Sequence, residues 1–289
     1  MPKISIIILT YNSIKFIKSC LDSIFTQDFS QLEIIIVDNN SSDGTVDFIK
    51  KSYSQVNLIE NKINLGAAKA RNQGIEISTG DWILTLDCDV VLERNFLANI
   101  AETVNNLPPN VGIIQPKILK SDRKTIYSKG IFISSFRRFY DIDQGIIDDG
   151  DLENSYIFGA CCASAIYRRK MLEELKEDSG YFDDRFFFLV EDVDIAWRAN
   201  KLGWKSILIP KLACYHSGNS SVFGKEIRQY LCFRNRYYSI SKNEGLKNYF
   251  KKIFPFILYD FPRIFYLAFT NRYFKQKISN RYRSDDSIN

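Results

Sequence analysis

The segment Trp82-Ile83-Leu84-Thr85-Leu86-Asp87-Cys88-Asp89 joins an apolar run to two acids that lie one residue apart. In an extended chain alternate side chains face the same way, so both carboxylates are expected at one place beyond the end of a strand. Carboxylate oxygens in that position can hold a divalent cation that carries a diphosphate. Acidic pairs after strands also commonly face only water, so the rest of the chain has to decide between these interpretations.

Two further apolar runs, Ile4–Leu9 and Leu32–Val37, are rich in β-branched residues and end in polar residues, as buried parallel strands do. Segments with helical spacing or turn signals separate the three runs, at Ser13–Phe25, Thr45–Lys51 and Lys69–Ile77. This alternation predicts a doubly wound α/β unit, in which a ligand binds beyond the carboxyl ends of the strands.

The polar residues after the predicted strands are Thr10-Tyr11-Asn12, Asp38-Asn39-Asn40 and Asp87-Cys88-Asp89. The remainder of residues 1–224 is less regular, but no low-complexity linker interrupts it, so we interpret it as the second half of the same domain. We therefore expect one domain over residues 1–224 and a different kind of segment, a tail, over residues 225–289.

The composition is that of an ordinary globular protein, because 45% of the 289 residues are hydrophobic and 25% are charged. The first apolar run is too short to span a bilayer and no cleavage site for a signal peptide follows it, so we expect no export. The 6 cysteines show no Cys-x-x-Cys spacing, which argues against a zinc site or a disulfide framework and favours reduced thiols in the cytosol.

The tail carries most of the positive charge. Residues 225–289 hold 14 Lys and Arg against 5 Asp and Glu, a net charge of +9, so the first 224 residues carry −4 of the total of +5. Within the tail, Tyr249–Phe274 alternates apolar and aromatic blocks with cations, and no uncharged stretch approaches the about 20 residues that a membrane span needs. This pattern predicts a helical segment that lies on a membrane surface, and it also suits a helical subdomain that packs on the catalytic domain or on a second copy of the chain.

Five motifs follow one another along the chain. They are Ile6–Asn12 (IIILTYN), Glu33–Thr45 (EIIIVDNNSSDGT), Asn64–Gly74 (NLGAAKARNQG), Gly80–Asp89 (GDWILTLDCD) and Phe188–Arg198 (FLVEDVDIAWR). In kind and order they resemble inverting glycosyltransferases of family 2, and most closely a rhamnosyltransferase-type branch. The resemblance implies a GT-A fold with a mixed central sheet, a nucleotide-sugar-binding half at residues 1–90 and an acceptor-side half at residues 91–224.

The resemblance also implies a donor site at the strand ends. Asp38 would accept a hydrogen bond from the imino group of uracil or thymine, although a turn or capping role before Ser41 remains open. Lys69 would contact the diphosphate but could equally be a solvated surface cation. The implied donor contacts are Thr10, Tyr11, Asn12, Asp38, Asn64, Gly66, Lys69, Arg71 and Asp87.

For the metal, the family implies Mg²⁺ or Mn²⁺ bound by Asp89 directly and by Asp87 directly or through water. His216 is the only histidine of the chain, and a histidine at this place in the family can be a third ligand, whereas a lone histidine can also be purely structural. The cation would neutralise charge on the departing nucleoside diphosphate.

For catalysis, Glu191-Asp192 resembles the family's Glu-Asp pair, in which the aspartate is the general base. Asp192 would take the proton of the acceptor hydroxyl during direct displacement, which inverts the anomeric centre. The acids of this segment could instead simply favour the first turn of the following helix, and Asp194 is the candidate for that structural role. Cys88 is expected to pack away from the metal.

The function predicted from these residues is metal-dependent transfer of a sugar, with rhamnose suggested by the branch alone, from a UDP- or dTDP-sugar to a hydroxyl of a glycan. We expect the acceptor on a polyprenyl lipid at the cytoplasmic face of the membrane, with the enzyme peripheral there, and a homo-oligomer remains open. The catalytic motifs argue against nucleic acid as a partner. The alternatives are a non-catalytic sugar-nucleotide-binding scaffold and a nucleotidyltransferase, which would want a glycine-rich basic loop where Thr10-Tyr11-Asn12-Ser13 stands.

Overall fold

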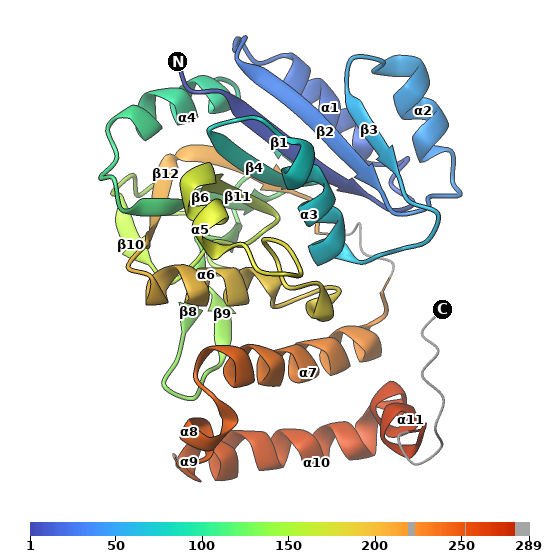
Figure 1. Cartoon of the computed structure of the whole chain (residues 1–289), viewed down its shortest axis with the longest axis vertical. Coiled ribbons are helices and arrows are strands. Elements are labelled where there is room, and N and C mark those ends of the chain that lie inside the picture. The colour runs from blue at the N-terminus through green and yellow to red at the C-terminus, as the bar shows by residue number, and fades with distance from the viewer. Residues whose placement is uncertain (219–222, 252, 281–289) are drawn as a thin grey trace. The chain divides into compact units, whose positions relative to one another are not determined.

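The computed structural model describes residues 1–218, 223–251 and 253–280, and the chain divides into two compact units (Figure 1). The first unit, which we call the catalytic unit, comprises Met1–Phe132 and Phe139–Ser221. The second, the C-terminal unit, comprises Ile133–Arg138 and Val222–Asn289. The functional division of the first unit at residue 90 stays a prediction.

The three strands predicted first are all present, and each extends one residue further than the apolar run. They are β1 (Ile4–Thr10), β2 (Leu32–Asp38) and β4 (Trp82–Asp87). Strand β1 lies between the other two and is parallel to both, with Thr10 opposite Asp38 and Leu9 opposite Asp87. The register therefore brings the polar strand ends to one edge of the sheet.

A fourth parallel strand, β3 (Asn57–Glu60), pairs with β2 and was not predicted. Its four residues are Asn-Leu-Ile-Glu, and only the two in the middle are apolar. A segment this short and this polar carries too little periodicity to be recognised without its neighbour.

The helices nearest these strands are α1 (Ile17–Phe25), α2 (Thr45–Ser52) and α3 (Ala67–Ile77). Helix α1 begins four residues later than predicted, and before it lies a turn in which the backbone N–H groups of Phe16 and Ile17 donate to the backbone oxygen of Ser13. Helix α3 begins two residues earlier than predicted.

The two faces of the sheet have separate cores because alternate strand residues face opposite ways. On one face Ile6 and Ile8 pack in a core with residues of α1, α2 and α4 (Phe96–Asn105). On the other face Ile7 packs with residues of α3, α5 (Arg169–Leu175) and α6 (Glu191–Lys201). The catalytic unit is therefore a three-layer α/β/α sandwich (Figure 1).

The second half of the sheet mixes strand directions, as predicted. The strand order is β10-β12-β6-β11-β4-β1-β2-β3, and β11 is antiparallel to both of its neighbours. Its elements are β5 (Val90–Leu92), β6 (Val111–Lys120), β7 (Ile126–Ser128), β10 (Ser155–Ile157), β11 (Ser164–Arg168) and β12 (Lys205–His216), with the 3-10 helix η1 (Asp184–Phe186) between α5 and α6. A separate two-stranded sheet pairs β8 (Ile131–Ile133) with β9 (Phe139–Asp141).

The C-terminal unit is helical, as the tail pattern indicated. Its elements are α7 (Lys225–Asn243), α8 (Leu246–Phe250), α9 (Ile253–Pro255), the π-helix η2 (Phe256–Asp260), α10 (Phe261–Thr270) and α11 (Arg272–Asn280). A buried ion pair of 2.6 Å joins Arg236 of α7 to Asp260, and the hydroxyl of Tyr249 donates to the same carboxylate. Among the described residues, no helix combines the length and the apolar character that a bilayer crossing requires.

Candidate active site

Asp38 ends β2 with its side chain buried and both of its oxygens already hydrogen-bonded. The hydroxyl of Thr10 donates to Oδ1 over 2.7 Å, and the backbone N–H of Ser41 donates to Oδ2 over 2.8 Å. The turn role that the sequence left open is thus present. A carboxylate has about four lone-pair sites, so it can still accept from a base, and that contact stays a prediction.

Asn12 adopts a left-handed backbone with φ of 53°, which asparagine tolerates better than most residues. Its Oδ1 accepts from the backbone N–H of Ser42 over 2.8 Å, and its own N–H donates to the hydroxyl of Ser41. The hydroxyl of Ser13 accepts from the N–H of Tyr11. The loop after β1 is therefore fixed to the loop after β2, at the edge where a donor is predicted to bind.

The start of α3 is held by the segment that leads into α6. Gly66 has φ of 81°, and a Cβ there would come within 2.5 Å of Phe187. The carbonyl of Phe187 accepts from the N–H of Ala67 over 2.6 Å, while Asn64 accepts from the N–H of Gly66. Asn64 and Gly66 thus shape this loop. Lys69 is half exposed, and its Nζ lies 3.8 Å from Asp184, so the structure places it on the surface of α3.

The acids after β4 and the end of β12 form the metal-binding candidate. Single ligand atoms of Asp87, Asp89 and His216 all lie within 4.8 Å of one another. Nε2 of His216 is 3.0 Å from Oδ1 of Asp89 and 4.0 Å from Oδ2 of Asp87. Because β12 pairs with β5, His216 lies opposite Val90, next to the acidic triplet. The structure thus brings together all three predicted ligands.

This donor set fits a small divalent cation. Two carboxylates and an imidazole are groups that Mg²⁺ and Mn²⁺ accept as ligands, and these three converge on one place from β4, the turn after it and β12. Nδ1 of His216 is buried and has no hydrogen-bond partner among the described residues, and the Tyr127 ring packs against the imidazole in a T-shaped arrangement at 4.2 Å between centroids. Cys88 points into the core and contacts the hydroxyl of Ser13, as expected for a packing residue.

The two acids of the triplet differ in their surroundings. The side chain of Asp89 is fully buried, and the hydroxyl of Ser217 donates to its Oδ2 over 2.9 Å. The side chain of Asp87 is 32% exposed, and burial raises its pKa while the charge of Arg71 opposes that rise. For His216, burial opposes the charged form, but the hydrogen bond to Asp89 and the nearby carboxylates raise its pKa.

Arg71 connects the metal-binding candidate to the base candidate. This buried guanidinium donates to Oε1 of Glu191 over 2.6 Å and lies 3.4 Å from Oδ1 of Asp87. The sequence suggested a diphosphate contact for Arg71. The structure shows its two terminal nitrogens directed at carboxylates from β4 and α6, of which Glu191 is 120 positions away along the chain, and the diphosphate contact stays a prediction.

Asp192 lies in the first turn of α6 with a partly exposed side chain. Its Oδ1 accepts from the backbone N–H of Val193, and the N–H of Cys162 approaches Oδ2 at 3.5 Å. Burial, and then the neighbouring charges of Glu191 and Asp141, raise the pKa of Asp192 to about 7. A carboxylate with that pKa is a stronger base than an ordinary aspartate, and it is about half ionised at neutral pH and mostly ionised at mildly alkaline pH.

Asp194, two residues further along α6, has the contacts of a structural residue. It is fully buried and forms a 2.9 Å ion pair with Nε of Arg198. The other nitrogens of Arg198 donate to the backbone oxygens of Leu175 and Tyr181, so the pair ties α6 to α5 and to the segment after it.

Two residues near the site were not predicted. Tyr127 of β7 packs on His216, and Asp141 of β9 contributes to the electrostatic field at both Asp192 and His216. The acidic segment that starts at Asp141 matches no motif of the sequence. Its position follows from long-range contacts, because buried Lys117 and Lys129 pair with acids of that loop.

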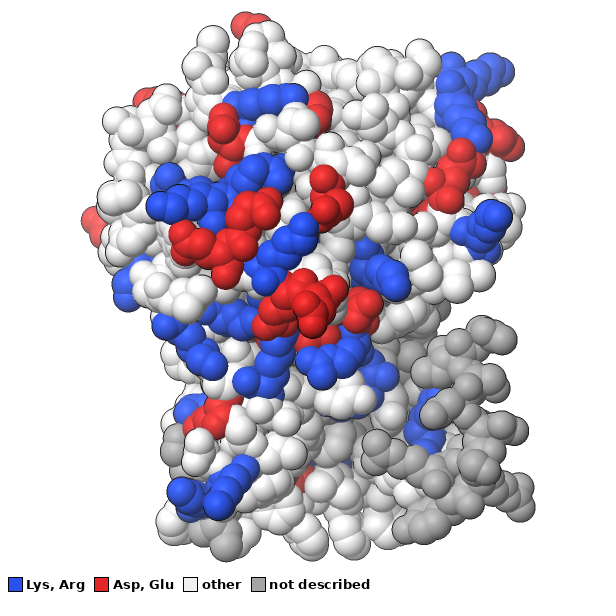
Figure 2. All heavy atoms as spheres, in the orientation of Figure 1, with Lys and Arg blue, Asp and Glu red and all other residues white. Residues whose placement is uncertain are grey.

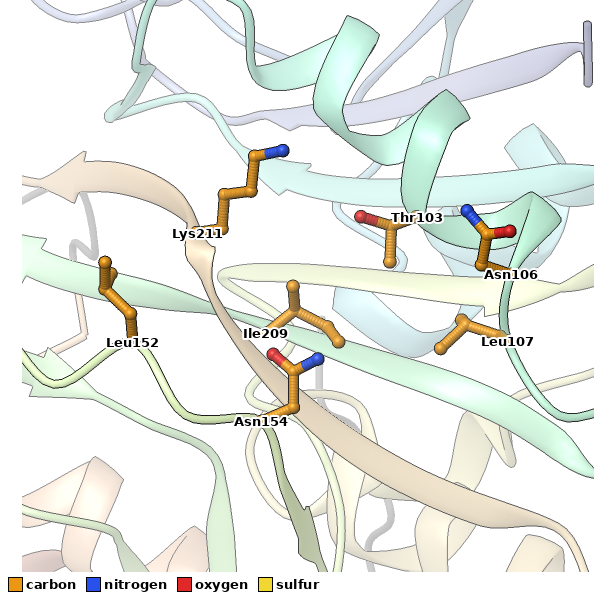
Figure 3. A pocket seen from close by; sticks show the side chains of 7 residues that line it. All are labelled: Thr103, Asn106, Leu107, Leu152, Asn154, Ile209 and Lys211. Atoms are coloured by element: carbon orange, nitrogen blue, oxygen red, sulfur yellow. The ribbon is translucent and has the colours of Figure 1, made fainter.

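A separate hollow of about 380 Å³ lies between α4, β12 and the segment before β10 (Figure 3). It contains none of the predicted site residues. Its one cation, Lys211, is paired with Glu102 at 2.8 Å. The residues that line it are Thr103, Asn106, Leu107, Leu152, Asn154, Ile209 and Lys211.

The Rossmann-like sheet with acids at its parallel strand ends, where nucleotides bind in doubly wound folds, is the arrangement expected of a nucleotide-sugar-dependent transferase with the GT-A fold. The profile of Glycosyl transferase family 2 matches residues 5–176, and the chain belongs to this family. The prediction of a glycosyltransferase with a mixed α/β GT-A fold and C-terminal helices is thereby confirmed. The comparisons give no support to a rhamnosyltransferase branch.

Similar proteins act in the assembly of glycans. The amylovoran biosynthesis glycosyltransferase AmsB of Erwinia amylovora is 28% identical over 224 residues, which are 73% of this chain and 69% of AmsB. A dolichyl N-acetyl-α-D-glucosaminyl phosphate 3-β-D-2,3-diacetamido-2,3-dideoxy-β-D-glucuronosyltransferase of Methanococcus voltae is 28% identical over 263 residues, 83% of this chain and 77% of that protein. The match covers only 29% of GlyA of Streptococcus pneumoniae.

Among solved structures, the mannosyltransferase PcManGT from Pyrobaculum calidifontis, in complex with GDP-Man and Mn²⁺, superimposes with a TM-score of 0.57. The superposition covers 98% of this chain and 76% of PcManGT, at 20% identity. At this identity the likeness establishes the shared fold and nothing further.

Proposed function

We propose that this protein transfers a sugar from a nucleoside diphosphate sugar to a hydroxyl of a glycan acceptor, with inversion and with the help of a divalent cation. The observation that carries the proposal is the convergence of Asp87, Asp89 and His216 at the strand ends, joined through Arg71 and Glu191 to the helix that bears Asp192. One part of this arrangement suits a diphosphate-bound cation and the other a general base.

Asp89 and His216 would hold the cation directly, because both are buried and already oriented toward each other. Asp87, which is more exposed, would complete the site directly or through water. A bound Mg²⁺ or Mn²⁺ supplies positive charge that stabilises the departing nucleoside diphosphate. The protein's own contribution is to orient these ligands through Ser217 and the packing of Tyr127.

Asp192 would accept the proton of the acceptor hydroxyl as the new glycosidic bond forms. Arg71 acts on Asp192 indirectly, since it fixes Glu191 next to it and its charge lowers the pKa of Asp192 against the effect of burial. We therefore assign Arg71 a positioning role.

If Asp192 is the base, the rate of transfer should decrease when the pH falls below the pKa of Asp192. The ionised form is the active one, so kcat/KM should fall as pH drops below about 7, where Asp192 becomes protonated. We expect an acid limb with an apparent pKa of about 7 in a pH-rate profile recorded at saturating Mn²⁺. A flat profile between pH 5.5 and 8 would assign the base to another group.

The donor is proposed to be a UDP- or dTDP-sugar bound between the loops after β1 and β2, with Asp38 reading the base. The suggestion that the donor sugar is rhamnose depends on the motif resemblance alone, so dTDP-rhamnose is one of the donors to be screened. A thermal-shift screen of UDP-, dTDP- and GDP-sugars, with and without Mn²⁺, should show stabilisation by one donor that requires the metal. Stabilisation by GDP-sugars alone, or by none, would contradict the proposed donor.

The acceptor is proposed to be a glycan on a polyprenyl lipid at the cytoplasmic face of the membrane, within surface-polysaccharide or glycan assembly. The names of the Erwinia and Methanococcus relatives, the second of which has a dolichyl-linked acceptor, support this choice. Release of the nucleoside diphosphate should therefore require acceptor lipids, and release that does not depend on them would contradict this acceptor.

A further inference from the structure

The C-terminal unit exposes a line of large apolar side chains along η2, α10 and the residue before Pro255. Their exposed fractions are 71% for Phe254, 51% for Ile257, 63% for Leu258, 57% for Phe261, 56% for Phe265 and 66% for Phe269. Successive members are one, three or four residues apart, so they lie on one side of the helical segment. The rings of Phe261, Phe265 and Phe269 contact one another in sequence, at 6.0 and 4.8 Å between centroids. We call these six residues the aromatic stripe.

Another side of the same helical segment packs against the interior of the C-terminal unit. Asp260, Leu267 and Asn271 are fully buried. Asp260 pairs with Arg236 of α7, and the side chain of Asn271 donates to the backbone oxygen of Glu226. The aromatic stripe therefore faces away from the core of the unit, and an apolar surface this continuous marks a contact with something else.

The excess of positive charge around the aromatic stripe indicates a negatively charged partner. Residues 246–280 contain 7 Lys and Arg and a single acid, Asp260, whose carboxylate is buried in the ion pair with Arg236. Exposed cations precede and follow the stripe along the chain, at Lys251, Arg272 and Lys275. On the visible face of the catalytic unit, by contrast, acidic and basic side chains are intermixed (Figure 2).

We propose that the aromatic stripe and its flanking cations bind the surface of an anionic lipid bilayer, with the rings inserted at the acyl boundary and the cations at the headgroups. Aromatic rings between cations, on a helix too short to span, are the features of an interfacial helix. A second copy of the chain fits less well, since a symmetric dimer through this face would bring two sets of cations together. The proposal deepens the proposed function, because a lipid-linked acceptor lies on such a surface.

The test is sedimentation of the full chain with vesicles of phosphatidylcholine alone or with about 30% of the anionic lipid phosphatidylglycerol, whose negative surface potential attracts cations. We expect binding to the anionic vesicles and a loss of at least about tenfold in affinity for a Phe261→Ser, Phe265→Ser, Phe269→Ser variant. The matched control replaces three equally exposed apolar residues of the catalytic unit, Ile63→Ser, Ile147→Ser and Leu202→Ser, and should bind like the original chain.

Replacing Lys251, Arg272 and Lys275 by glutamine should reduce the preference for anionic over neutral vesicles by about 10²-fold, because the attraction of three cations to the headgroups is lost. A Phe265→Trp variant should shift its emission to shorter wavelength on vesicle addition, and Leu202→Trp should not. Equal sedimentation of the stripe variant and the control, or a stripe-dependent dimer with no vesicle binding, would overturn the proposal. The assay uses no sugar transfer, so its failure leaves the proposed function standing, and the reverse also holds.

Discussion

An Asp192→Asn variant is expected to lose nearly all transfer activity while it keeps its affinity for the donor. Asparagine has the shape of aspartate but cannot take a proton from the acceptor hydroxyl. Loss of a general base typically costs a factor of about 10²–10⁴, so we expect kcat to fall by at least about 10². Initial rates of nucleoside diphosphate release with acceptor present, together with calorimetric titration of the donor, would measure both quantities.

A suitable control is Asp47→Asn. Asp47 is exposed and, like Asp192, lies in the first turn of its helix, so this variant also loses an acid that the helix dipole favours. It should retain full activity. At pH 8 the Asp192→Asn variant should unfold at the same temperature as the original chain or higher, because it removes a charge that faces Glu191 and Asp141. Activity within about tenfold of the original would assign the base elsewhere.

The second large effect is expected at Asp89. An Asp89→Asn variant keeps a side chain that can fill the same buried space beside His216 and Ser217, but it loses the charge that would bind the cation. We expect Mn²⁺ to stop strengthening the binding of the nucleoside diphosphate. We also expect turnover to fall by about 10³, since a Lewis acid contributes several kcal/mol to the stabilisation of transition-state charge and 1.4 kcal/mol corresponds to about tenfold.

Calorimetry of UDP and dTDP binding, with and without Mn²⁺, separates this loss from misfolding. Binding in the absence of metal should be the same in the variant and the original chain. Asp28→Asn, at an exposed position in the catalytic unit, controls for the change of charge. Mn²⁺ dependence that survives in Asp89→Asn would move the metal site away from the acidic triplet.

The parts of the fold that the sequence predicts are those in which a local pattern has one interpretation. The apolar runs that became β1, β2 and β4 are continuous and bounded by polar residues, so buried strands are the natural reading. Strand β3 has no such pattern. Strand β11 was not predicted either, because its place between β4 and β6, antiparallel to both, depends on pairings with residues 52 to 86 positions away along the chain.

In the candidate site, too, the residues that belong to a local pattern could be predicted and those that depend on long-range contacts could not. Sequence motifs include three of the candidate residues, Asp87, Asp89 and Asp192, and His216 is noticeable as the only histidine of the chain. The structure places the three predicted metal ligands together. The roles of Arg71, Tyr127 and Asp141 depend on contacts across the sheet that no local spacing encodes. Arg71 shows the limit most clearly, since the residue type was recognised from its motif while its buried carboxylate partners were not.

The stereochemistry of transfer tests the central claim most directly. If a base removes the acceptor proton while the nucleoside diphosphate leaves with its cation, the reaction is a single displacement at the anomeric carbon. Proton NMR of the product, formed with the donor that the thermal-shift screen selects, should then show the anomeric configuration opposite to that of the donor. A product that keeps the configuration of the donor would contradict direct displacement and the role assigned to Asp192.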